Sequence, residues 1–407
     1  MRKILLLVAL FLAISLNAQD SRYDAGLNLP FNEKAGDVNP QTGNLTLGFT
    51  DVSLPGRAGF DFTFGRTWSL NQSNVFNMYQ DGNGANKLSS NTVEKHYRMG
   101  VGWSNNIPYI MEDNDSANKV LNLFFGGNVY EINQTSVVTN NPKLSNLLGY
   151  DLVDMRIFQS QEIDYVGSGI NNTNVTNYGL RASTLTERSK YCLLLKNNEK
   201  YWFSNNGELM MASDKSEQNK IWYFYDTQNR LKIVIDSIGR VIRFLYDTTS
   251  GNLIKIEWDI KVGEKGTNGE RNWNNKTRSV EYSYIGGERF PDVMSLKGDV
   301  LSYKMPYLLE VVTDPMGNKA KYEYDSGMAG FTFNSEKSHW QNVYLMIVGI
   351  MDKWDDTDGK YKNKRVFEYE TPSKGLYTKW FYKGYMEYYK VSREYYISKD
   401  GNEEKKI

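Results

Sequence analysis

Apolar and polar residues alternate in short stretches along most of the chain after residue 20, and Gly-, Asn- and Asp-rich turns separate the stretches. In "KAKYEY", residues 319–324, every second position is apolar or aromatic. This period of two is typical of a half-buried β-strand. Sustained helical periodicity is hard to find. We therefore predict an all-β fold, in which an N-terminal β domain of sandwich or meander type precedes an antiparallel sheet.

Two stretches of this pattern are near copies of each other. "VIDSIGRVIRFLYD" (234–247) and "VTDPMGNKAKYEYD" (312–325) both place Gly three residues after an Asp and end in Tyr-Asp. Asp at the first and Gly at the fourth position suit a type I turn, so turns are predicted at Asp236–Gly239 and Asp314–Gly317. The aromatic residues that follow should face one common core: Phe244, Tyr246, Tyr322 and Tyr324.

A period of 22 residues extends the pattern from about 201 to 258. Leu209, Leu231 and Leu253 are 22 residues apart, as are Gly207, Asn229 and Gly251. The repeating unit is a strand, a short turn, a second strand and a Tyr-Asp pair, and agreement at several spacings favours a true repeat. Asp247 and Asp325 are expected to end strands and to accept hydrogen bonds from the backbone that follows.

The repeated units resemble YD repeats, also called RHS repeats, which are named for a Tyr-Asp pair. Tyr225-Asp226, Tyr246-Asp247 and Tyr324-Asp325 occupy that place. Upstream, "VNPQTGNLTLGFTDVSLPGRAGFDFTFGRTW" (38–68) and "GVGWSNNIPYI" (100–110) are similar to the segments that open many exported RHS-type proteins. The resemblance covers about half of the chain that follows the leader.

The resemblance implies a spiralling antiparallel sheet that, in large family members, closes a shell around a C-terminal toxin domain or other cargo. Related architectures serve in adhesion. The implied partners are the rest of a larger RHS polypeptide, a toxin domain, or a surface glycan or protein. About three units are recognisable here, so the chain is interpreted as the start of a larger polypeptide or as a truncated member.

The predicted organisation has four parts. Residues 1–18 form a signal peptide, 19–200 an N-terminal β domain, 201–330 the repeat region, and 331–407 degenerate repeats or further strands. A polar insertion at 259–278 interrupts the repeats and reads as an extended hairpin or a mobile loop. Residues 328–346 are ambiguous, and a short helix there is one alternative.

The first residues, "MRKILLLVALFLAISLNAQD", place a basic start before a short apolar run and a plausible cleavage point after Ala18. This is the layout of a secretory signal peptide, and no later run is long enough for a membrane-spanning helix. The predicted location is therefore outside the cytoplasm of a bacterium: secreted, periplasmic or at the cell surface.

Composition adds little that suggests chemistry. The chain has 29 Tyr, 18 Phe and 9 Trp and no formal net charge, which argues against nucleic acid as a partner. Cys192 is the only cysteine and is expected to be buried and inert. The two histidines, His96 and His339, lack a catalytic or metal-binding pattern, and His96 is expected at the surface. No cofactor, metal or catalytic residue is predicted.

Acidic and aromatic clusters were the remaining candidates for binding. Asp352–Gly359 superficially resembles a calcium loop but has Trp354 at the first ligand position, so an acidic turn is the better interpretation. A similar acidic turn is expected at Glu112, Asp113 and Asp115. The aromatic stretch 377–396 fits either a covered strand or a sugar-binding face, and we favour the first.

Three functions follow, in order of preference. The first is a non-enzymatic exported scaffold, the N-terminal part of an RHS/YD-repeat toxin-delivery or cell-surface protein. The second is an extracellular binding module for glycans or a partner protein. A hydrolase is a distant third.

Overall fold

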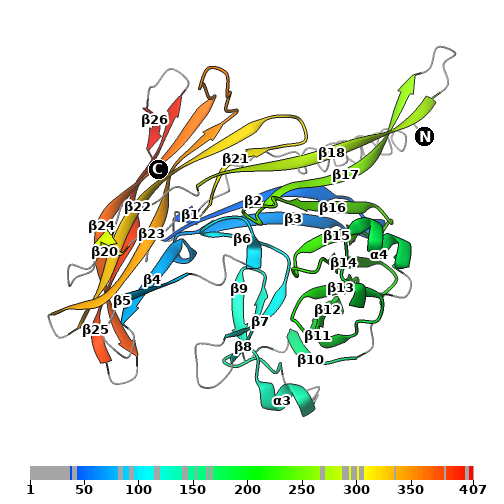
Figure 1. The fold of residues 1–407 in the computed structure, drawn as a ribbon, viewed down its shortest axis with the longest axis horizontal. Helices are drawn as coiled ribbons and strands as arrows, with labels where there is room; N and C mark the ends of the chain where they lie inside the picture. Colours follow the sequence, from blue (N-terminus) through cyan, green and yellow to red (C-terminus); the bar gives the residue numbers. More distant parts are fainter. Residues whose placement is uncertain are drawn as a thin grey trace, which may run out of the picture.

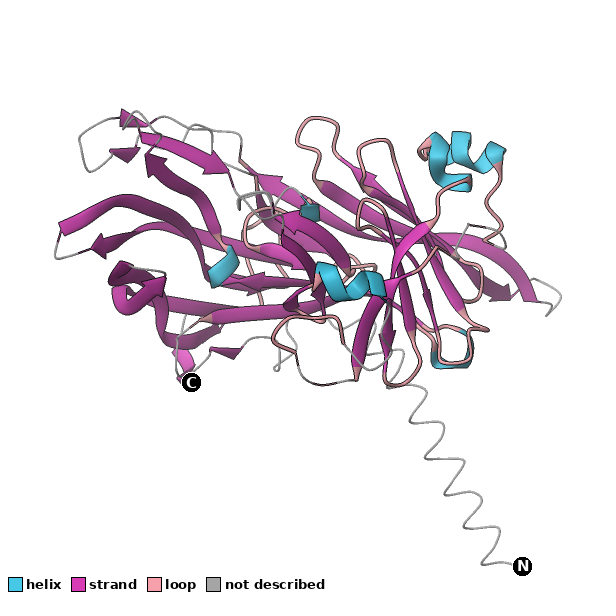
Figure 2. Ribbon diagram, turned by 90° about the horizontal axis from the view of Figure 1, so that it is seen from below, coloured by secondary structure: helices cyan, strands magenta, loops and turns pink. Residues whose placement is uncertain are grey.

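The computed structural model describes residues 37–38, 44–80, 86–90, 96–113, 120–139, 145–150, 152, 154–161, 165, 168–265, 271–286, 293–294, 300–301, 307–333, 336–379, 382–398 and 403–406. These residues are mostly in antiparallel strands (Figure 1), which confirms the all-β prediction. The helices among them are short and lie outside the sheets (Figure 2): η1 (Arg57–Gly59), η2 (Leu70–Gln72), α3 (Gln134–Thr139), α4 (Asn172–Tyr178) and η3 (Ala182–Leu185). No helix of the described residues is long and apolar enough to cross a membrane.

The largest sheet contains seventeen of the described strands, and most of them are neighbours in both sequence and space. Its first part is β10 (Met155–Gln159), β11 (Ser189–Leu195), β12 (Lys200–Ser204), β13 (Leu209–Ser213), β14 (Lys220–Tyr225), β15 (Leu231–Ile235) and β16 (Val241–Tyr246). Its second part is β17 (Leu253–Lys265), β18 (Arg271–Ile285), β21 (Leu308–Thr313), β22 (Lys319–Phe333), β23 (Glu336–Asp352), β24 (Asn363–Lys379), β25 (Tyr382–Ser398), β26 (Glu403–Lys406), β4 (Asn74–Gln80) and β5 (Asn86–Ser90).

The large sheet starts at Met155, upstream of residue 201, where the repeat region was expected to begin. The division into domains at that residue stays a prediction. The described residues of 259–278, which are 259–265 and 271–278, belong to the long hairpin of β17 and β18, which projects from the body of the molecule (Figure 1). Within 328–346, the described residues form parts of β22 and β23, so the alternative of a short helix there is wrong.

Three smaller sheets complete the described structure. One has the order β1 (Asp37–Val38), β2 (Leu45–Leu54), β3 (Phe62–Ser69), β6 (Trp103–Asn105). The second contains β7 (Tyr109–Asp113), β8 (Val120–Phe125) and β9 (Asn128–Glu131), and β19 (Val293–Met294) pairs with β20 (Val300–Leu301). In β3 every second side chain is buried, and β2 has the same alternation on either side of a register shift between Thr50 and Val52, because one face of this hairpin packs on the large sheet and the other faces solvent.

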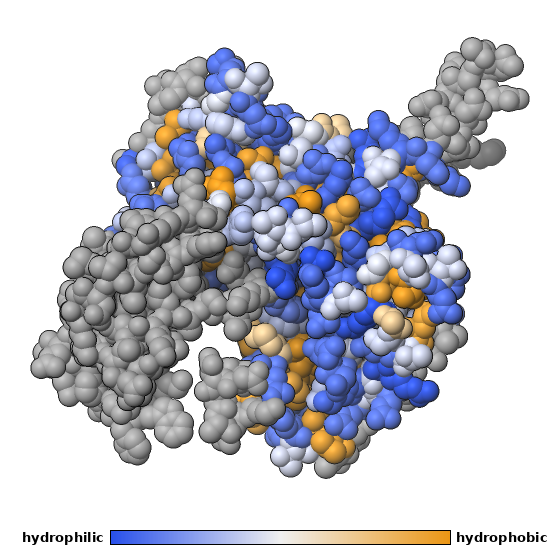
Figure 3. Space-filling view, in the orientation of Figure 1, coloured by the Kyte–Doolittle hydropathy of each residue, from blue (hydrophilic) through white to orange (hydrophobic). Residues whose placement is uncertain are grey.

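Burial along the large sheet reflects what covers each face. All five residues of β13 are buried, whereas in β16 buried and half-buried positions alternate. One face of the large sheet shares a core with the small β2–β3–β6 sheet. On the opposite face, β11 to β15 share a second core with the segment around α4, so strands in this part are apolar on both sides. The described surface shown in Figure 3 is mainly polar, with small apolar areas.

Candidate functional site

The two predicted turns have the same hydrogen bonds. The N–H of Gly239 donates to the carbonyl of Asp236 over 2.9 Å, and the N–H of Gly317 donates to that of Asp314 over 3.0 Å. Each aspartate side chain accepts from two further backbone N–H groups, at residues 238 and 240 and at residues 316 and 318. Both glycines have positive φ, 87° and 85°, which a β-carbon would strain. The turns are type I turns followed by a left-handed residue.

Two further aspartates of the Tyr-Asp pairs also open turns. Asp226 accepts from the N–H of Asn229, which takes the left-handed position with a φ of 58°. Asp247 accepts from the N–H of Gly251, and its side chain accepts from Thr249 and Ser250. These hydrogen bonds, with Ser250 first, lower the pKa of Asp247 below its ordinary value because they stabilise the carboxylate.

Asp325 differs from the other aspartates, and the expectation that it ends a strand is wrong. It lies inside β22, exposed to solvent and opposite Met346 of β23. The sequence that follows, Ser326-Gly327-Met328, continues in register with β23 instead of turning. The Tyr-Asp pair therefore does not by itself specify a turn.

The tyrosines of the Tyr-Asp pairs make one recurring contact. The hydroxyl groups of Tyr225, Tyr246 and Tyr324 donate to backbone carbonyls in the preceding strand of the sheet: Leu209, Leu231 and Leu309, over 2.9, 2.8 and 2.6 Å. Burial raises the pKa of all three hydroxyls, so each stays protonated and acts as a donor. Each tyrosine thus reaches back across its own sheet.

Each of these tyrosines also lies at a register shift with the next strand. Tyr225 is opposite Leu231, and Tyr246 is opposite Leu253, each just after an irregularity in the pairing. Leu231 therefore contacts two ladder tyrosines. Its backbone lies opposite Tyr225, and its carbonyl accepts the hydrogen bond from the hydroxyl of Tyr246. Bulges of this kind increase twist and re-aim side chains. Here they turn the tyrosine toward the preceding strand.

Two tyrosines outside any Tyr-Asp pair make the same contact. Tyr284 donates to Leu253 over 2.6 Å, and Tyr369 donates to Ile347 over 2.8 Å, each next to a register shift. Neither tyrosine is predicted by a Tyr-Asp pair, because Ile285 and Glu370 stand where the pair would have Asp. The signal that would have found them is an aromatic residue two positions earlier: Tyr282 and Phe367 here, as in Tyr223, Phe244 and Tyr322.

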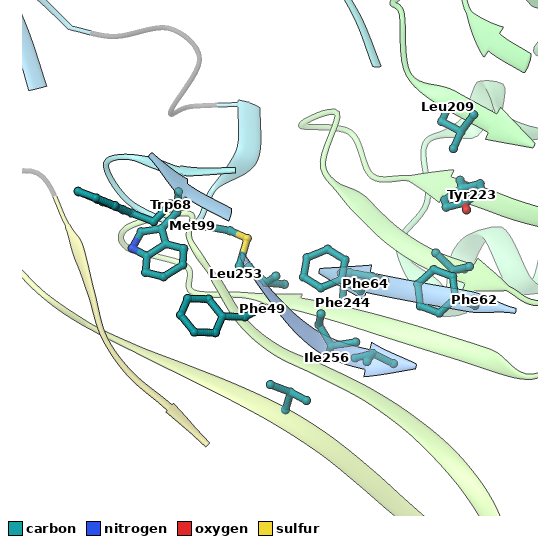
Figure 4. Close-up of a cluster of buried hydrophobic side chains, with 14 of the residues drawn as sticks. Phe49, Phe62, Phe64, Trp68, Met99, Leu209, Tyr223, Phe244, Leu253 and Ile256 are labelled. Atoms are coloured by element: carbon teal, nitrogen blue, oxygen red, sulfur yellow. The ribbon is translucent and has the colours of Figure 1, made fainter. Parts of the chain in front are cut away.

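We call this set the tyrosine ladder. Among the described residues it comprises Tyr225, Tyr246, Tyr284, Tyr324 and Tyr369. The aromatic residues two positions earlier fill the core below it. Phe244 and Tyr322 are each 1% exposed, and the ring of Phe244 lies 5.5 Å from that of Phe64 in an edge-on arrangement (Figure 4). Tyr246 and Tyr324 pack against the same cluster.

The opening segment of the chain contacts a repeat turn directly. In the "LPGR" stretch (54–57), the N–H of Arg57 donates to the hydroxyl of Ser237, and that hydroxyl donates to the carbonyl of Phe60, each over 2.9 Å. Arg240 of the same turn donates to the carbonyl of Pro55. A β-carbon on Gly56 would lie 1.8 Å from the carbonyl oxygen of Phe60, so only glycine fits this contact.

A buried ion pair lies where the small sheet meets the large one. Arg66 of β3 donates through Nε to both carboxylate oxygens of Asp51, at 2.9 and 2.8 Å, and the hydroxyl of Tyr282 donates to Asp51 over 2.8 Å. The guanidinium lies 4.5 Å from the centre of the Phe49 ring and 4.8 Å from that of Trp103. Burial acts to lower the pKa of Arg66, but Asp51 and the neighbouring tyrosines raise it overall, so the arginine stays charged.

The "GVGWS" segment joins this cluster to the ladder. Trp103 donates through Nε1 to the hydroxyl of Tyr324 over 3.0 Å, and that hydroxyl donates to Leu309. The residues that carried the resemblance in the opening segments, Asp51, Arg66 and Trp103, therefore converge on the ladder although they are far apart in sequence.

Residues 190–254 match the family model described as "Teneurin YD-shell". This segment contains β12 to β16, two ladder tyrosines and the turns at Asp226 and Asp236. Residues 190–254 are thus similar to the YD-repeat family. The repeats have a structural role in the chain, since their tyrosines tie neighbouring strands of one sheet together.

Solved structures of toxin complexes also align with the chain. The crystal structure of TcdB2-TccC3 is 12% identical with a TM-score of 0.35, and the alignment covers 85% of this chain and 17% of that one. A Photorhabdus luminescens Tc holotoxin pore structure is 14% identical with a TM-score of 0.31, over 92% of this chain and 19% of that one. The chain thus spans less than a fifth of their length. Both scores lie below 0.5, so neither alignment establishes a shared overall fold. No curated protein matches the sequence.

The remaining candidates for chemistry lie apart from the ladder. Cys192 is buried, and His96 is exposed with its ring stacked on Tyr109. Asp355 opens a surface turn within Asp352–Gly359, where the N–H of Gly359 donates to its carbonyl. In the part of the chain that the structure describes, no three His, Cys, Asp or Glu residues are grouped so as to hold a metal.

Some predicted positions fall outside the described side chains. His339 lies in β23, Tyr377 lies in β24, and the tyrosines from Tyr382 to Tyr389 lie in β25, but their side chains are outside the described residues. Trp380 and Phe381 lie outside the described residues altogether. Asp115 is also outside them. In the described end of the aromatic stretch, Tyr396 and Tyr395 lie beside Arg365 and Arg393 in cation–π contacts.

Proposed function

We propose that this chain is a non-enzymatic exported scaffold, in which the large sheet serves as a wall segment of an RHS-type assembly. The tyrosine ladder carries the proposal. Each ladder tyrosine connects its own strand to both neighbouring strands: its backbone lies opposite a residue of the next strand, and its hydroxyl donates to a carbonyl of the preceding strand. The sheet therefore resists shear between its strands. The ladder continues past the residues matched by the family model, to Tyr369.

The contact with the opening segment supports the same role. The Asp51–Arg66 pair and the contact between 54–57 and the Asp236 turn fix the small sheet on the core face of the wall. Breaking a buried ion pair by removing one partner typically costs ~3–5 kcal/mol. Polar contacts of this kind set one orientation of the two sheets, which a purely apolar interface would specify less sharply.

The layout of the first twenty residues supports export, and the proposed partners are other parts of an RHS polypeptide or a toxin domain enclosed with it. The test is expression of the whole chain in a bacterium, followed by cell fractionation and mass spectrometry of the N-terminus. Cleavage after Ala18 and recovery outside the cytoplasm are expected. An intact N-terminus on a cytoplasmic protein would refute export.

The wall role has a separate test. The chain is expressed together with any YD-repeat polypeptide encoded beside it, and the purified assembly is imaged by electron cryo-microscopy. The expected result is one continuous sheet in which this chain contributes consecutive strands. The hydrolase hypothesis would replace the scaffold if the purified chain alone hydrolysed a substrate and one carboxylate substitution abolished that activity.

A further inference from the structure

A compact segment between β10 and β11 covers part of the large sheet. We define this strap as residues 168–187, which include α4 and η3. Its base is closed, because the N–H of Ser160 donates to the carbonyl of Lys190 over 3.0 Å and the hydroxyl of Ser189 donates to that of Ser160 over 2.9 Å. β10 and β11 pair from Met155↔Leu195 to Gln159↔Tyr191 without any strap residue. Movement of the strap would therefore leave these pairs intact.

The strap satisfies much of its own hydrogen bonding. Asn171 and Asn174 form a reciprocal capping box at the start of α4, and Gly179 ends the helix in the left-handed conformation. The N–H of Leu180 donates to the carbonyl of Val175 within the strap. No residue of α4 is fully buried, although Val175 and Tyr178 pack with half-buried side chains against the apolar cluster under the strap.

Polar contact between strap and sheet is concentrated at Arg181. Its Nη1 and Nη2 donate to the two carboxylate oxygens of Glu208, over 3.0 and 2.6 Å, and Nη1 also donates to Asn229 over 3.1 Å. Its backbone N–H donates to the carbonyl of Tyr225 over 3.1 Å. Among the described residues, every side-chain hydrogen bond from the strap to the sheet and its turns comes from Arg181. Nη2 also donates to Glu187 at the strap's end.

The face under the strap is apolar. It carries Cys192, Met211, Trp222 and Phe224, which are all buried in one cluster, and Leu180 of the strap belongs to the same cluster. Further along the sheet, the cross-strand ion pairs Arg243–Glu257 and Lys255–Glu281 are partly exposed to solvent. The strap thus shields from water the part of the sheet whose side chains are apolar.

From this arrangement we propose that the strap is a conformational device that opens as a unit while the repeat sheet stays paired, and that Arg181 holds it closed. Opening uncovers the apolar face of β11 to β15 and makes the thiol of Cys192 accessible. Local opening of this kind requires a segment with few polar ties and a closed base, and the strap has both. Tyr165, just before the strap, is held on the sheet separately by its hydroxyl, which donates to the carbonyl of Tyr223 over 2.9 Å. The proposal is independent of the scaffold role.

Cys192 provides the test, because it is the only cysteine of the chain. The rate of its reaction with a chromogenic disulfide reagent is measured on the native protein, and global stability is measured by urea unfolding. In the Arg181→Ala variant we expect labelling to rise by more than roughly 100-fold, because removing one partner of a buried ion pair leaves the other charge buried and unpaired. Amide hydrogens of β13 to β15 should keep their protection while those of the strap lose theirs.

The matched control is Arg243→Ala. This arginine forms partly exposed ion pairs with Glu257 and Asp259 on the same sheet. It should change labelling by no more than about threefold, in line with its change in global stability. Should Arg181→Ala fail to fold, Glu208→Gln keeps the hydrogen-bonding shape without the charge and should raise labelling roughly tenfold. If Cys192 in every variant reacts at the rate of global unfolding, the strap does not open separately and the proposal is wrong.

Discussion

Two parts of the large sheet achieve strand pairing in different ways. From β13 to β16 the strands are short, 5 to 6 residues, and aspartate turns separate several of them. From β22 to β25 the strands are 15 to 17 residues long, and the aspartate of a Tyr-Asp pair lies inside a strand. Tyr369 nevertheless places a ladder rung in the second part. The difference shows that the turns and the ladder are separate features of the repeat.

The largest expected loss of stability comes from core substitutions, which test whether both parts of the sheet depend on the same core. Phe244 and Phe367 are each 1% exposed. Replacing either by Ala should lower the free energy of unfolding by about 3–5 kcal/mol, because a large cavity remains in a packed core. Urea denaturation followed by tryptophan fluorescence measures this. As a control, Ile254→Ala, at a position 36% exposed, should cost much less. A small effect at Phe367 alone would mean that the two parts do not share a core.

The second prediction separates the turn role of aspartate from its place in a Tyr-Asp pair. The Asp236 side chain is fully buried and accepts from Ile238, Arg240 and the Arg240 guanidinium. Asp236→Ala should therefore cost about 1–3 kcal/mol of stability. Asp325→Ala, in an exposed strand position, should stay within about 0.5 kcal/mol. Thermal unfolding of the two variants makes the comparison, and equal losses would restore a common role for both residues.

The third prediction asks whether the ladder is equally strong in both parts. Tyr246→Phe and Tyr369→Phe each remove one hydroxyl and leave a carbonyl in the preceding strand without that donor. Each should lower the free energy of unfolding by about 1 kcal/mol. The matched control is Tyr191→Phe, at a buried tyrosine of β11 outside the ladder. A loss at Tyr246 but none at Tyr369 would confine the ladder to the repeat region.

The smallest effect concerns pH and is specific to the repeat turns. Hydrogen bonds from Ser250 lower the pKa of Asp247 below 3.8. Desolvation acts to raise the pKa of Asp214, but hydrogen bonds from Asn219 and Ser216 lower it overall. Because both folded-state pKa values lie below the unfolded value, this stabilisation is complete above pH 3.8 and is lost as the pH falls through the folded values.

The measurement is the stability of the protein and of Asp247→Asn between pH 5 and pH 2. The unsubstituted protein should lose more stability over this interval than the variant, since the variant has one fewer carboxylate to protonate. An identical pH profile would show that Asp247 does not contribute.

The sequence determined the parts of the fold that depend on neighbouring residues. Alternation of apolar and polar positions predicted the strands, and Asp-x-x-Gly predicted a turn wherever the next residues could start a new strand. The Tyr-Asp pair was a wrong signal for a strand end at Asp325, because the chain there continues in register with β23, the next strand of the same hairpin, and the pair itself does not decide between turning and continuing. Tyr284 and Tyr369 were missed for a similar reason, since their function lies in the hydroxyl contact and not in the residue that follows.

Only the tertiary structure decided what the opening segment does. The sequence marked Asp51, Arg66 and Trp103 through their motifs but gave no reason for them. Folding brings the first two into a buried ion pair against Tyr282 and places Trp103 on Tyr324. A charge pair is stable there only because aromatic rings and donors from both sheets surround it. Local sequence therefore specified the strands, and long-range packing specified which strands lock together.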